Sequence, residues 1–188
     1  MSVKRLFDIL FCIVGLLLFL IPLILISIVI KLTSKGPALF WSDRVGRNSV
    51  IFKMPKFRTM YLGSPNVATH LLKDSNKLIT PVGSFLRKTS LDELPQLWSI
   101  LKGQMSVVGP RPALFNQYDL IELRKEKGVD QLSPGLTGWA QINGRDEIPN
   151  IEKVELDLYY LENNSFLFDL KVVFLTFFKV MKRDGVVH

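Results

Sequence analysis

One uncharged run near the N-terminus constrains this chain more than any other feature. It covers residues 9–30, which include no charged side chain, and Pro22 lies just past its middle. At ~1.5 Å per residue, a straight helix over this run would reach about 33 Å, enough for a hydrocarbon core of ~30 Å. Because Pro22 lacks a backbone N–H and clashes with the preceding turn, we expect a kink or break between Leu18 and Pro22. Residues 1–32 are therefore predicted to form a proline-broken membrane helix.

Basic residues flank this run on both sides. Lys4 and Arg5 precede it, and Lys31 and Lys35 follow it. Basic flanks mark the cytoplasmic side of a membrane segment, so the sequence favours a re-entrant helix that bends at the proline and leaves by the face it entered. A single spanning helix with a proline kink remains open as the alternative. The re-entrant hypothesis places residues 33–188 on the cytoplasmic membrane face, as one compact domain.

The net charge indicates which kinds of ligand or surface the chain can bind, and the cysteine and histidine content bears on disulfides and metal sites. The 188 residues carry a formal net charge of +7, which suits an anionic leaflet or phosphorylated ligands. The basic residues are spread through the chain without a nucleic-acid-binding signature, so nucleic acid is not an expected partner. Cys12 is the single cysteine, and the histidines are His70 and His188. This content gives neither a disulfide framework nor a zinc site.

Periodicity predicts a mostly helical α+β fold beyond the membrane segment. Two short apolar runs, 38–41 and 50–54, flank a turn-rich segment and predict a hairpin or a pair of short extended segments. Helices are expected over 82–101 with a break near Thr89 and Ser90, over 114–127 with an end at Gly128, and over 151–161. A loop with some helix is expected over 61–76, and a structured loop over 132–145.

The last segment, residues 166–183, is apolar on nearly every side of a helix. Asp169, Lys171 and Lys179 interrupt it too often for a membrane span. We therefore favour an amphipathic helix in the membrane interface with snorkelling lysines, and leave core packing as the alternative.

A carboxylate pair, Asp92 and Glu93, is the first candidate for chemistry. Ser90 and Glu93 have the spacing of a capping box, which offers a purely structural interpretation, and a helix that begins at Pro95 is a competing register. In either case the pair lies at a helix N-terminus, where the ionised carboxylate is favoured. An ionised carboxylate is what a nucleophile or a metal ligand requires. Arg87 adds positive charge nearby.

Three further segments supply cations or close backbone approach. Pro110 and Pro112 fix the backbone around Arg111, which would make its guanidinium a good phosphate ligand, although a surface turn is the alternative. A basic cluster at 53–58 is more often solvated surface than a site. The three glycines of segment 134–145 permit close approach of the backbone, and Trp139, Gln141 and Arg145 of this segment could serve a base or a sugar.

Taken together and in this order, these motifs resemble the monotopic phosphoglycosyl transferases, which are small bacterial sugar transferases. The resemblance covers nearly the whole chain. The motifs that carry it are residues 4–8 (KRLFD), 56–60 (KFRTM), 90–97 (SLDELPQL), 109–112 (GPRP), 134–138 (PGLTG), 144–145 (GR) and 157–160 (DLYY). The resemblance also favours the minimal form of the family, without the additional N-terminal membrane helices of larger relatives.

The resemblance implies an activity, a cofactor and partners. Members transfer a sugar 1-phosphate from a UDP-sugar to undecaprenyl phosphate with Mg²⁺ and release UMP. The expected donor carries an N-acetylated amino sugar, and the expected location is the bacterial inner membrane, with the catalytic domain, residues 33–188, facing the cytoplasm. A homodimer is left open. Asp92 is implied as the nucleophile that forms a phosphosugar-enzyme intermediate and as a metal ligand, and Glu93 as its catalytic partner. Phosphate-binding roles are implied for Arg111, Arg87, Lys56 and Arg145.

The match departs from the family pattern at two positions. Ile21 stands where many members have serine before the membrane proline, and Ser133 stands where many have arginine. Asp157 and Asp169 match acidic family positions, and the sequence leaves open whether each is catalytic or belongs to a buried ion pair. Two non-enzymatic hypotheses also remain: a membrane-anchored binding module in which Asp92 only caps a helix, and an inactive paralogue that acts as a scaffold.

Overall fold

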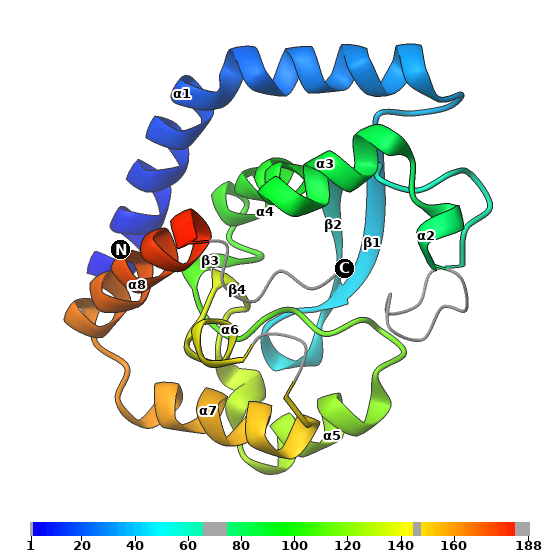
Figure 1. Cartoon of the computed structure of the whole chain (residues 1–188). Helices are drawn as coiled ribbons and strands as arrows, with labels where there is room; N and C mark the ends of the chain where they lie inside the picture. The colour runs from blue at the N-terminus through cyan, green and yellow to red at the C-terminus, as the bar shows by residue number, and fades with distance from the viewer. Residues whose placement is uncertain (1, 66–74, 145–147, 183–188) are drawn as a thin grey trace.

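The membrane segment forms one long bent helix. The computed structural model describes residues 2–65, 75–144 and 148–182, and its first element is α1 (Val3–Thr33). Figure 1 shows α1 bending part-way along, so that its first part lies beside α8 (Phe166–Lys182) and its second part crosses above α3 (Pro81–Thr89). Pro22 lies inside the helix and leaves the carbonyl of Leu18 without its helical donor. The predicted kink is confirmed, and the helix bends without a break in its assignment.

Most of α1 has no protein partner for its apolar side chains among the described residues. Leu17, Leu18 and Ile21 are about 70% exposed, at 71%, 70% and 69%. Within the described parts of the chain, α1 is the helix long and apolar enough to cross a membrane. The choice between a re-entrant and a spanning path stays a prediction.

The predicted hairpin is confirmed, with longer strands than the apolar runs indicate. Strands β1 (Leu39–Val45) and β2 (Ile51–Phe57) pair antiparallel around the short helix η1 (Arg47–Ser49). Side chains alternate across a strand, so Phe52, Met54 and Lys56 share one face of β2. Near the end of β2 both faces are covered, because Pro55 and Phe57 are buried as well as Met54, and the Lys56 side chain is 17% exposed.

Helices make up most of the remaining structure. The predicted break near Ser90 is confirmed, because Ser90 takes a left-handed conformation with φ 55° between α3 and the next helix. Gly128, with φ 68°, ends the helix before it as predicted. The remaining helices are α2 (Ser75–Leu78), η3 (Leu91–Gln96), α4 (Leu97–Leu101), α5 (Tyr118–Glu126), η4 (Val129–Gln131), α6 (Trp139–Asn143) and α7 (Asn150–Glu162).

Segment 132–145, expected to be a loop, contains a strand and a helix instead. Strand β4 (Gly135–Thr137) pairs in parallel with β3 (Ser106–Val108), and α6 follows at once. Glycine makes this contact feasible: a Cβ on Gly135 would lie 2.1 Å from the backbone nitrogen of Gly109, and one on Gly138 would lie 2.1 Å from its carbonyl oxygen. Gly135 and Gly138 thus approach the backbone of residues 109–110, and contact of Trp139 and Gln141 with a base or a sugar stays a prediction.

Replacing Gly135 by alanine is expected to destabilise this junction by about 2–3 kcal/mol, because two backbone segments must separate to admit the methyl group. Thermal unfolding in detergent measures the loss. Gly63→Ala is the control: Gly63 has φ +84° but no atom within 4 Å of its added Cβ, so only about 1 kcal/mol of backbone strain is expected. Equal losses in the two variants would contradict the packing explanation.

The apolar core joins the first part of α1 to the rest of the chain. It includes side chains from α1, β2, α4, β3, α6, α7 and α8: Cys12, Met54, Ile100, Val107, Ile142, Tyr160 and Val172. Arg5 also donates to the carbonyls of Ile100 and Leu101 at the end of α4, at 2.6 and 2.7 Å. The first turns of the membrane helix are thus integrated with the domain that follows.

Helix α8 has one buried and one exposed face. Asp169 and Val172 are buried, whereas Leu167, Phe174 and Phe177 are 77%, 62% and 61% exposed. Core packing therefore explains one face of α8. Contact with the membrane interface stays a prediction for its exposed apolar face.

Candidate active site

The carboxylate pair lies in the first turn of η3, directly after the left-handed Ser90. The Ser90 side chain makes no capping hydrogen bond, and the Glu93 carboxylate contacts Lys56 instead of the helix end. The capping-box interpretation is therefore wrong. The competing register is wrong as well, because η3 already begins at Leu91 and Pro95 lies inside it. Helix capping therefore does not account for the presence of the two carboxylates at this position.

Glu93 is held in the ionised state by the cations around it. Lys56 Nζ donates to Glu93 Oε1 at 2.7 Å, and Arg111 Nη1 lies 3.6 Å from the same oxygen. Burial opposes ionisation, but the positive charge of Lys56, Arg111 and Arg44 outweighs it and lowers the pKa of Glu93 to about 2. Glu93 therefore links β2 to the segment around Arg111 through a fixed negative charge.

Asp92 has the opposite electrostatic environment. It is 8% exposed, and burial raises its pKa to about 6 although Lys56, Arg87 and Arg111 all favour the ionised form. The neighbouring Glu93 charge also raises this pKa. None of the described side chains donates a hydrogen bond to Asp92. Its carboxylate at neutral pH is consequently a poorly solvated anion, which is a reactive state for a nucleophile.

Three of the four predicted phosphate ligands gather around this pair. Lys56 contacts Glu93, Arg111 lies beside it with a side chain 34% exposed, and Arg87 reaches from α3 to donate its Nε to Thr59 Oγ1 at 2.9 Å. Burial lowers the pKa of Arg87, and the charge of Asp92 opposes that change. The fourth, Arg145, lies outside the described residues.

A small polar cavity adjoins Glu93, and Asp92 is not among its lining residues, which include some that sequence reasoning missed. Its lining comprises Arg44, Met54, Lys56, Glu93, Gln96, Arg111, Pro112 and Gly135. Arg44 donates its Nη1 to the Pro112 carbonyl at 3.0 Å, so it also fixes the backbone next to Arg111. The signal that could have found Arg44 is its place across the hairpin from the buried Phe52.

The structure places both unassigned aspartates in buried ion pairs. Asp157 Oδ2 accepts from Arg124 Nε at 3.0 Å and from Nη2 at 2.7 Å, and Arg124 Nη1 donates to the Arg111 carbonyl at 2.8 Å. Asp169 pairs with Lys4 at 2.6 Å. Neither is a catalytic group by this geometry, because each carboxylate is engaged away from Asp92. The helical spacing of the buried Val154, Asp157 and Tyr160 could have indicated such a role.

The donor set is compatible with Mg²⁺ only if substrate oxygens complete it. The described residues contain no group of three or more histidine, cysteine or acidic side chains. Mg²⁺ bound through one or two carboxylates together with phosphate oxygens needs no larger protein set. Asp92 fits as the carboxylate ligand, because Lys56 and Arg111 already engage Glu93 Oε1.

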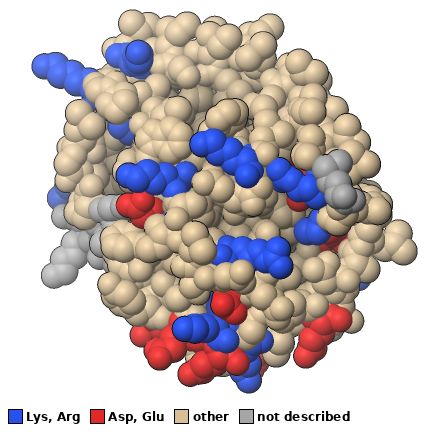
Figure 2. Space-filling view, turned by 180° about the vertical axis from the view of Figure 1, so that it is seen from behind, with Lys and Arg blue, Asp and Glu red and all other residues tan. Residues whose placement is uncertain are grey.

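Acidic side chains concentrate at one end of the molecule. Figure 2 shows mainly Lys and Arg across the middle of the back face and most of the acidic side chains at its lower edge, where Lys and Arg lie among them. This is the end where Figure 1 places α5 and α7, opposite the second part of α1. Exposed acidic residues of these two helices include Asp119, Glu122, Glu126, Glu152 and Glu155. An anionic membrane surface would thus repel the end farthest from the apolar helix.

The known proteins that this chain is similar to are named as sugar or sugar-phosphate transferases. The chain is 40% identical over 186 residues to "Uncharacterized sugar transferase EpsL" of Bacillus subtilis (strain 168), covering 99% of this chain and 91% of that protein. It is 43% identical to "UDP-glucose:undecaprenyl-phosphate glucose-1-phosphate transferase" of Escherichia coli (strain K12), over 94% of this chain and 39% of that protein. It is 38% identical to "Undecaprenyl-phosphate galactose phosphotransferase" of Salmonella typhimurium, over 97% and 41% respectively.

The extent of these matches separates two kinds of relative. The chain spans almost the whole of the Bacillus subtilis protein, but only about two fifths of the Escherichia coli and Salmonella proteins. The family model described as "Bacterial sugar transferase" matches residues 1–183, which include α1, the carboxylate pair and α8. The chain therefore belongs to the bacterial sugar transferase family of enzymes.

Proposed function

We propose that this protein transfers a sugar 1-phosphate from a UDP-sugar to undecaprenyl phosphate through a covalent intermediate on Asp92, and releases UMP. The observation that carries the proposal is the unequal carboxylate pair. Glu93 is neutralised by Lys56 and Arg111, whereas Asp92 is buried and poorly solvated beside the same cations. The relatives named for glucose and galactose transfer to undecaprenyl phosphate support this reaction class.

The reaction divides into two displacements at one phosphorus atom. An Asp92 carboxylate oxygen attacks the phosphorus that bears the sugar, the bond from this phosphorus to the bridging oxygen breaks, and UMP leaves with that oxygen and its electron pair. An oxygen of undecaprenyl phosphate then attacks the same phosphorus. The Asp92 oxygen leaves as a carboxylate, and the enzyme returns to its starting state.

The surrounding cations offset the repulsion between an anionic nucleophile and an anionic phosphate. Arg111 and Lys56 line the cavity beside Glu93, and the charge of Arg87, in α3, favours the ionised form of Asp92. Fixed guanidinium groups stabilise the charge that spreads over the phosphate oxygens in such transition states. Glu93 is a positioning residue in this scheme, since its carboxylate holds Lys56 at 2.7 Å and lies 3.6 Å from Arg111.

The proposal includes Mg²⁺, with Asp92 and the donor phosphates as its ligands. When bound, it supplies positive charge to the phosphate oxygens and helps to orient them. The inner-membrane location with a cytoplasm-facing domain, the re-entrant path of α1 and a place at the first membrane step of surface glycan assembly are proposed on the same basis. The apolar exposure of α1 and the acidic end opposite it support that placement.

The identity of the sugar stays a separate question. The sequence resemblance favours an N-acetylated amino sugar, whereas the relatives named above act on glucose and galactose. A donor panel should therefore contain UDP-glucose and UDP-galactose beside UDP-N-acetylglucosamine, UDP-N-acetylgalactosamine and 6-deoxy amino-sugar donors.

Intact-protein mass spectrometry tests the proposal directly. The purified chain in detergent is mixed with Mg²⁺ and each donor, without undecaprenyl phosphate, beside Asp92→Asn. We expect a mass gain equal to one sugar phosphate in the wild type alone, with one UMP released per adduct. UMP release that requires the lipid acceptor and leaves no adduct would favour direct displacement. An adduct that persists in Asp92→Asn would exclude Asp92 as the nucleophile, and neither adduct nor UMP with any donor would favour the binding-module or scaffold hypotheses.

The rate of adduct formation is expected to fall by up to about tenfold per pH unit at acidic pH. Only ionised Asp92 attacks; burial raises its pKa to about 6 and bound Mg²⁺ opposes that rise, so the fall should begin at or below pH 6 and move to lower pH as the Mg²⁺ concentration increases. Single-turnover measurements from pH 4.5 to 8 without acceptor test this prediction. Omitting the acceptor matters, because phosphate monoesters titrate near pH 6 themselves. A rate whose pH dependence does not respond to the Mg²⁺ concentration, or that already falls above pH 7, would contradict this description of Asp92.

A further inference from the structure

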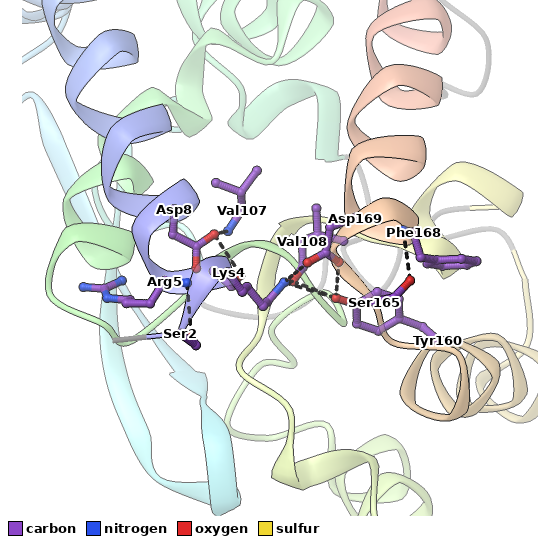
Figure 3. A network of polar contacts seen from close by, with 11 residues as sticks. Ser2, Lys4, Arg5, Asp8, Val107, Val108, Tyr160, Ser165, Phe168 and Asp169 are labelled. Atoms are coloured by element: carbon purple, nitrogen blue, oxygen red, sulfur yellow. Dashed lines mark hydrogen bonds and ion pairs between the residues drawn. The ribbon is translucent and has the colours of Figure 1, made fainter.

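The first turns of α1 contact β3, and β3 leads directly into the segment that carries Arg111. Figure 3 shows Lys4 and Asp8 pointing from α1 toward Val107 and Val108, with Tyr160 and Asp169 on the far side of Lys4. The side chains come from α1 and from the consecutive helices α7 and α8, which lie far from α1 in the sequence. They converge on the strand that precedes the phosphate-binding candidate and not on Asp92.

The Lys4 ammonium group has a hydrogen-bond acceptor for each of its three N–H groups. Its Nζ donates to the Val108 carbonyl at 3.0 Å, to Tyr160 Oη at 3.2 Å and to Asp169 Oδ2 at 2.6 Å. Tyr160 Oη donates in turn to Asp169 Oδ1 at 2.5 Å. A lysine ammonium has three N–H groups, so this set fixes its position completely. Tyr160 and Asp169 are each 1% exposed, and the Lys4 side chain is 29% exposed.

Asp8 fixes the other half of the strand. Its Oδ1 accepts from the Val107 backbone N–H at 2.9 Å and from Ser106 Oγ at 3.0 Å. Asp8 is buried, so these bonds are shielded from water. All three residues of β3 are thus held by side chains of the membrane helix, independently of the pairing between β3 and β4.

The backbone between Val108 and Arg111 has little freedom to absorb a displacement. Gly109 N–H donates to the Thr137 carbonyl at 2.9 Å, and the Pro110 carbonyl accepts from Gly135 N–H at 2.8 Å. The prolines on both sides of Arg111 fix their own φ angles. A shift of the Val108 carbonyl is therefore transmitted to Arg111 along the chain.

We propose that Lys4 is a positioning residue for Arg111: through Val108 it sets where the Arg111 guanidinium meets the diphosphate of the nucleotide donor. The inference rests on the proposed function, because it assigns Arg111 to a donor phosphate. It gives the N-terminal cation of the membrane helix a second task beside marking the cytoplasmic flank. The first turn of α1 becomes part of the phosphate-holding apparatus.

A double-mutant cycle on ligand binding distinguishes positioning from general stabilisation. The full-length protein in detergent is titrated with UDP, which carries the diphosphate without a sugar, in the presence of Mg²⁺. Lys4→Met is expected to raise the Kd for UDP about tenfold when Arg111 is present, as for loss of one well-placed charge-assisted contact. In the Arg111→Ala background the same substitution should change Kd less than about twofold, because its target is gone. Thermal unfolding is followed in all four proteins.

Two further variants separate positioning from charge and from folding. Lys4→Arg keeps the positive flank but replaces the compact ammonium by a planar fork, so we expect it to raise Kd as Lys4→Met does. Arg5→Met removes the neighbouring cation, which bonds to α4 and not to β3, and its effect on Kd should be the same in both Arg111 backgrounds. Each comparison is made between proteins with a cooperative unfolding transition.

The inference would be overturned if Lys4→Met raised the Kd for UDP by the same factor in the presence of Arg111 and in the Arg111→Ala background. Wild-type affinity for UDP in Lys4→Arg would overturn it as well. The readout is binding, so it does not depend on turnover. A wild type that binds UDP but forms no adduct with any donor would therefore contradict the proposed reaction alone, while the cycle still decides the role of Lys4.

Discussion

Replacing Asp92 by asparagine is expected to raise the stability of the folded protein above pH 7 while it abolishes sugar-phosphate transfer. Burial raises the pKa of Asp92 from 3.8 to about 6, so the folded state favours the neutral carboxyl. The ionised form therefore costs stability. This cost is absent below the unfolded-state pKa, grows as the pH rises from 3.8 to about 6, and is complete above that. It amounts to about 3 kcal/mol at most, and asparagine removes it.

The matched control is Glu93→Gln, which is expected to have the opposite effect. The cations around Glu93 lower its pKa from 4.5 to about 2, so its ionised form contributes stability above pH 4.5 that is lost as the pH falls toward 2. Glutamine removes this contribution of about 3 kcal/mol at neutral pH and leaves Lys56 without its partner. Two adjacent carboxamide substitutions should thus shift the melting temperature in opposite directions.

Thermal unfolding from pH 4 to 8 in detergent, together with UMP release, tests the pair. At pH 8, we expect a rise of several degrees for Asp92→Asn and a similar fall for Glu93→Gln, with the rise for Asp92→Asn vanishing near pH 4. Loss of at least about 10³-fold in UMP release is expected for Asp92→Asn. If Asp92→Asn unfolded at a lower temperature than the wild type at pH 8, the poorly solvated nucleophile would be the wrong description of this site.

The elements that could be predicted from the sequence are those with a repeated local pattern. Three such patterns can each be identified from a short stretch of consecutive residues. They are the uncharged run with Pro22, the apolar runs around the hairpin turn and the apolar spacing of α7. The β3–β4 pair could not be found in this way. Its strands have three residues each, and their pairing depends on Gly109 and Gly135, whose backbones come within contact only in the folded chain.

Most residues of the site could be predicted from the sequence, but the different roles of the two carboxylates could not. Spacing placed Asp92 and Glu93 at a helix start, and the family resemblance assigned them to chemistry. Which carboxylate is neutralised depends on Lys56, and its contact with Glu93 joins residues 37 positions apart, so no local pattern reveals it. The capping-box interpretation failed for the same reason, because a tertiary ion pair replaced the local bond to the helix end.

The second large effect is expected at the buried pair behind Arg111. Asp157→Asn should destabilise the protein by about 3 kcal/mol, or ~6–12 °C, because it leaves the Arg124 charge buried without a counter-ion. Glu155→Gln, on the exposed face of the same helix, is the control and should change stability by less than about 0.5 kcal/mol.

The reverse substitution separates stability from function. Arg124→Met leaves Asp157, whose pKa burial already raises, and a carboxyl without its partner can take up a proton. Its loss of stability should therefore be smaller at pH 5 than at pH 8. The double variant Arg124→Met/Asp157→Met should recover most of the stability lost in Asp157→Asn, since no buried charge remains. Transfer should stay impaired, because the Arg111 carbonyl has lost the donor at 2.8 Å that holds it. Recovery of transfer together with stability would show that the pair serves folding alone.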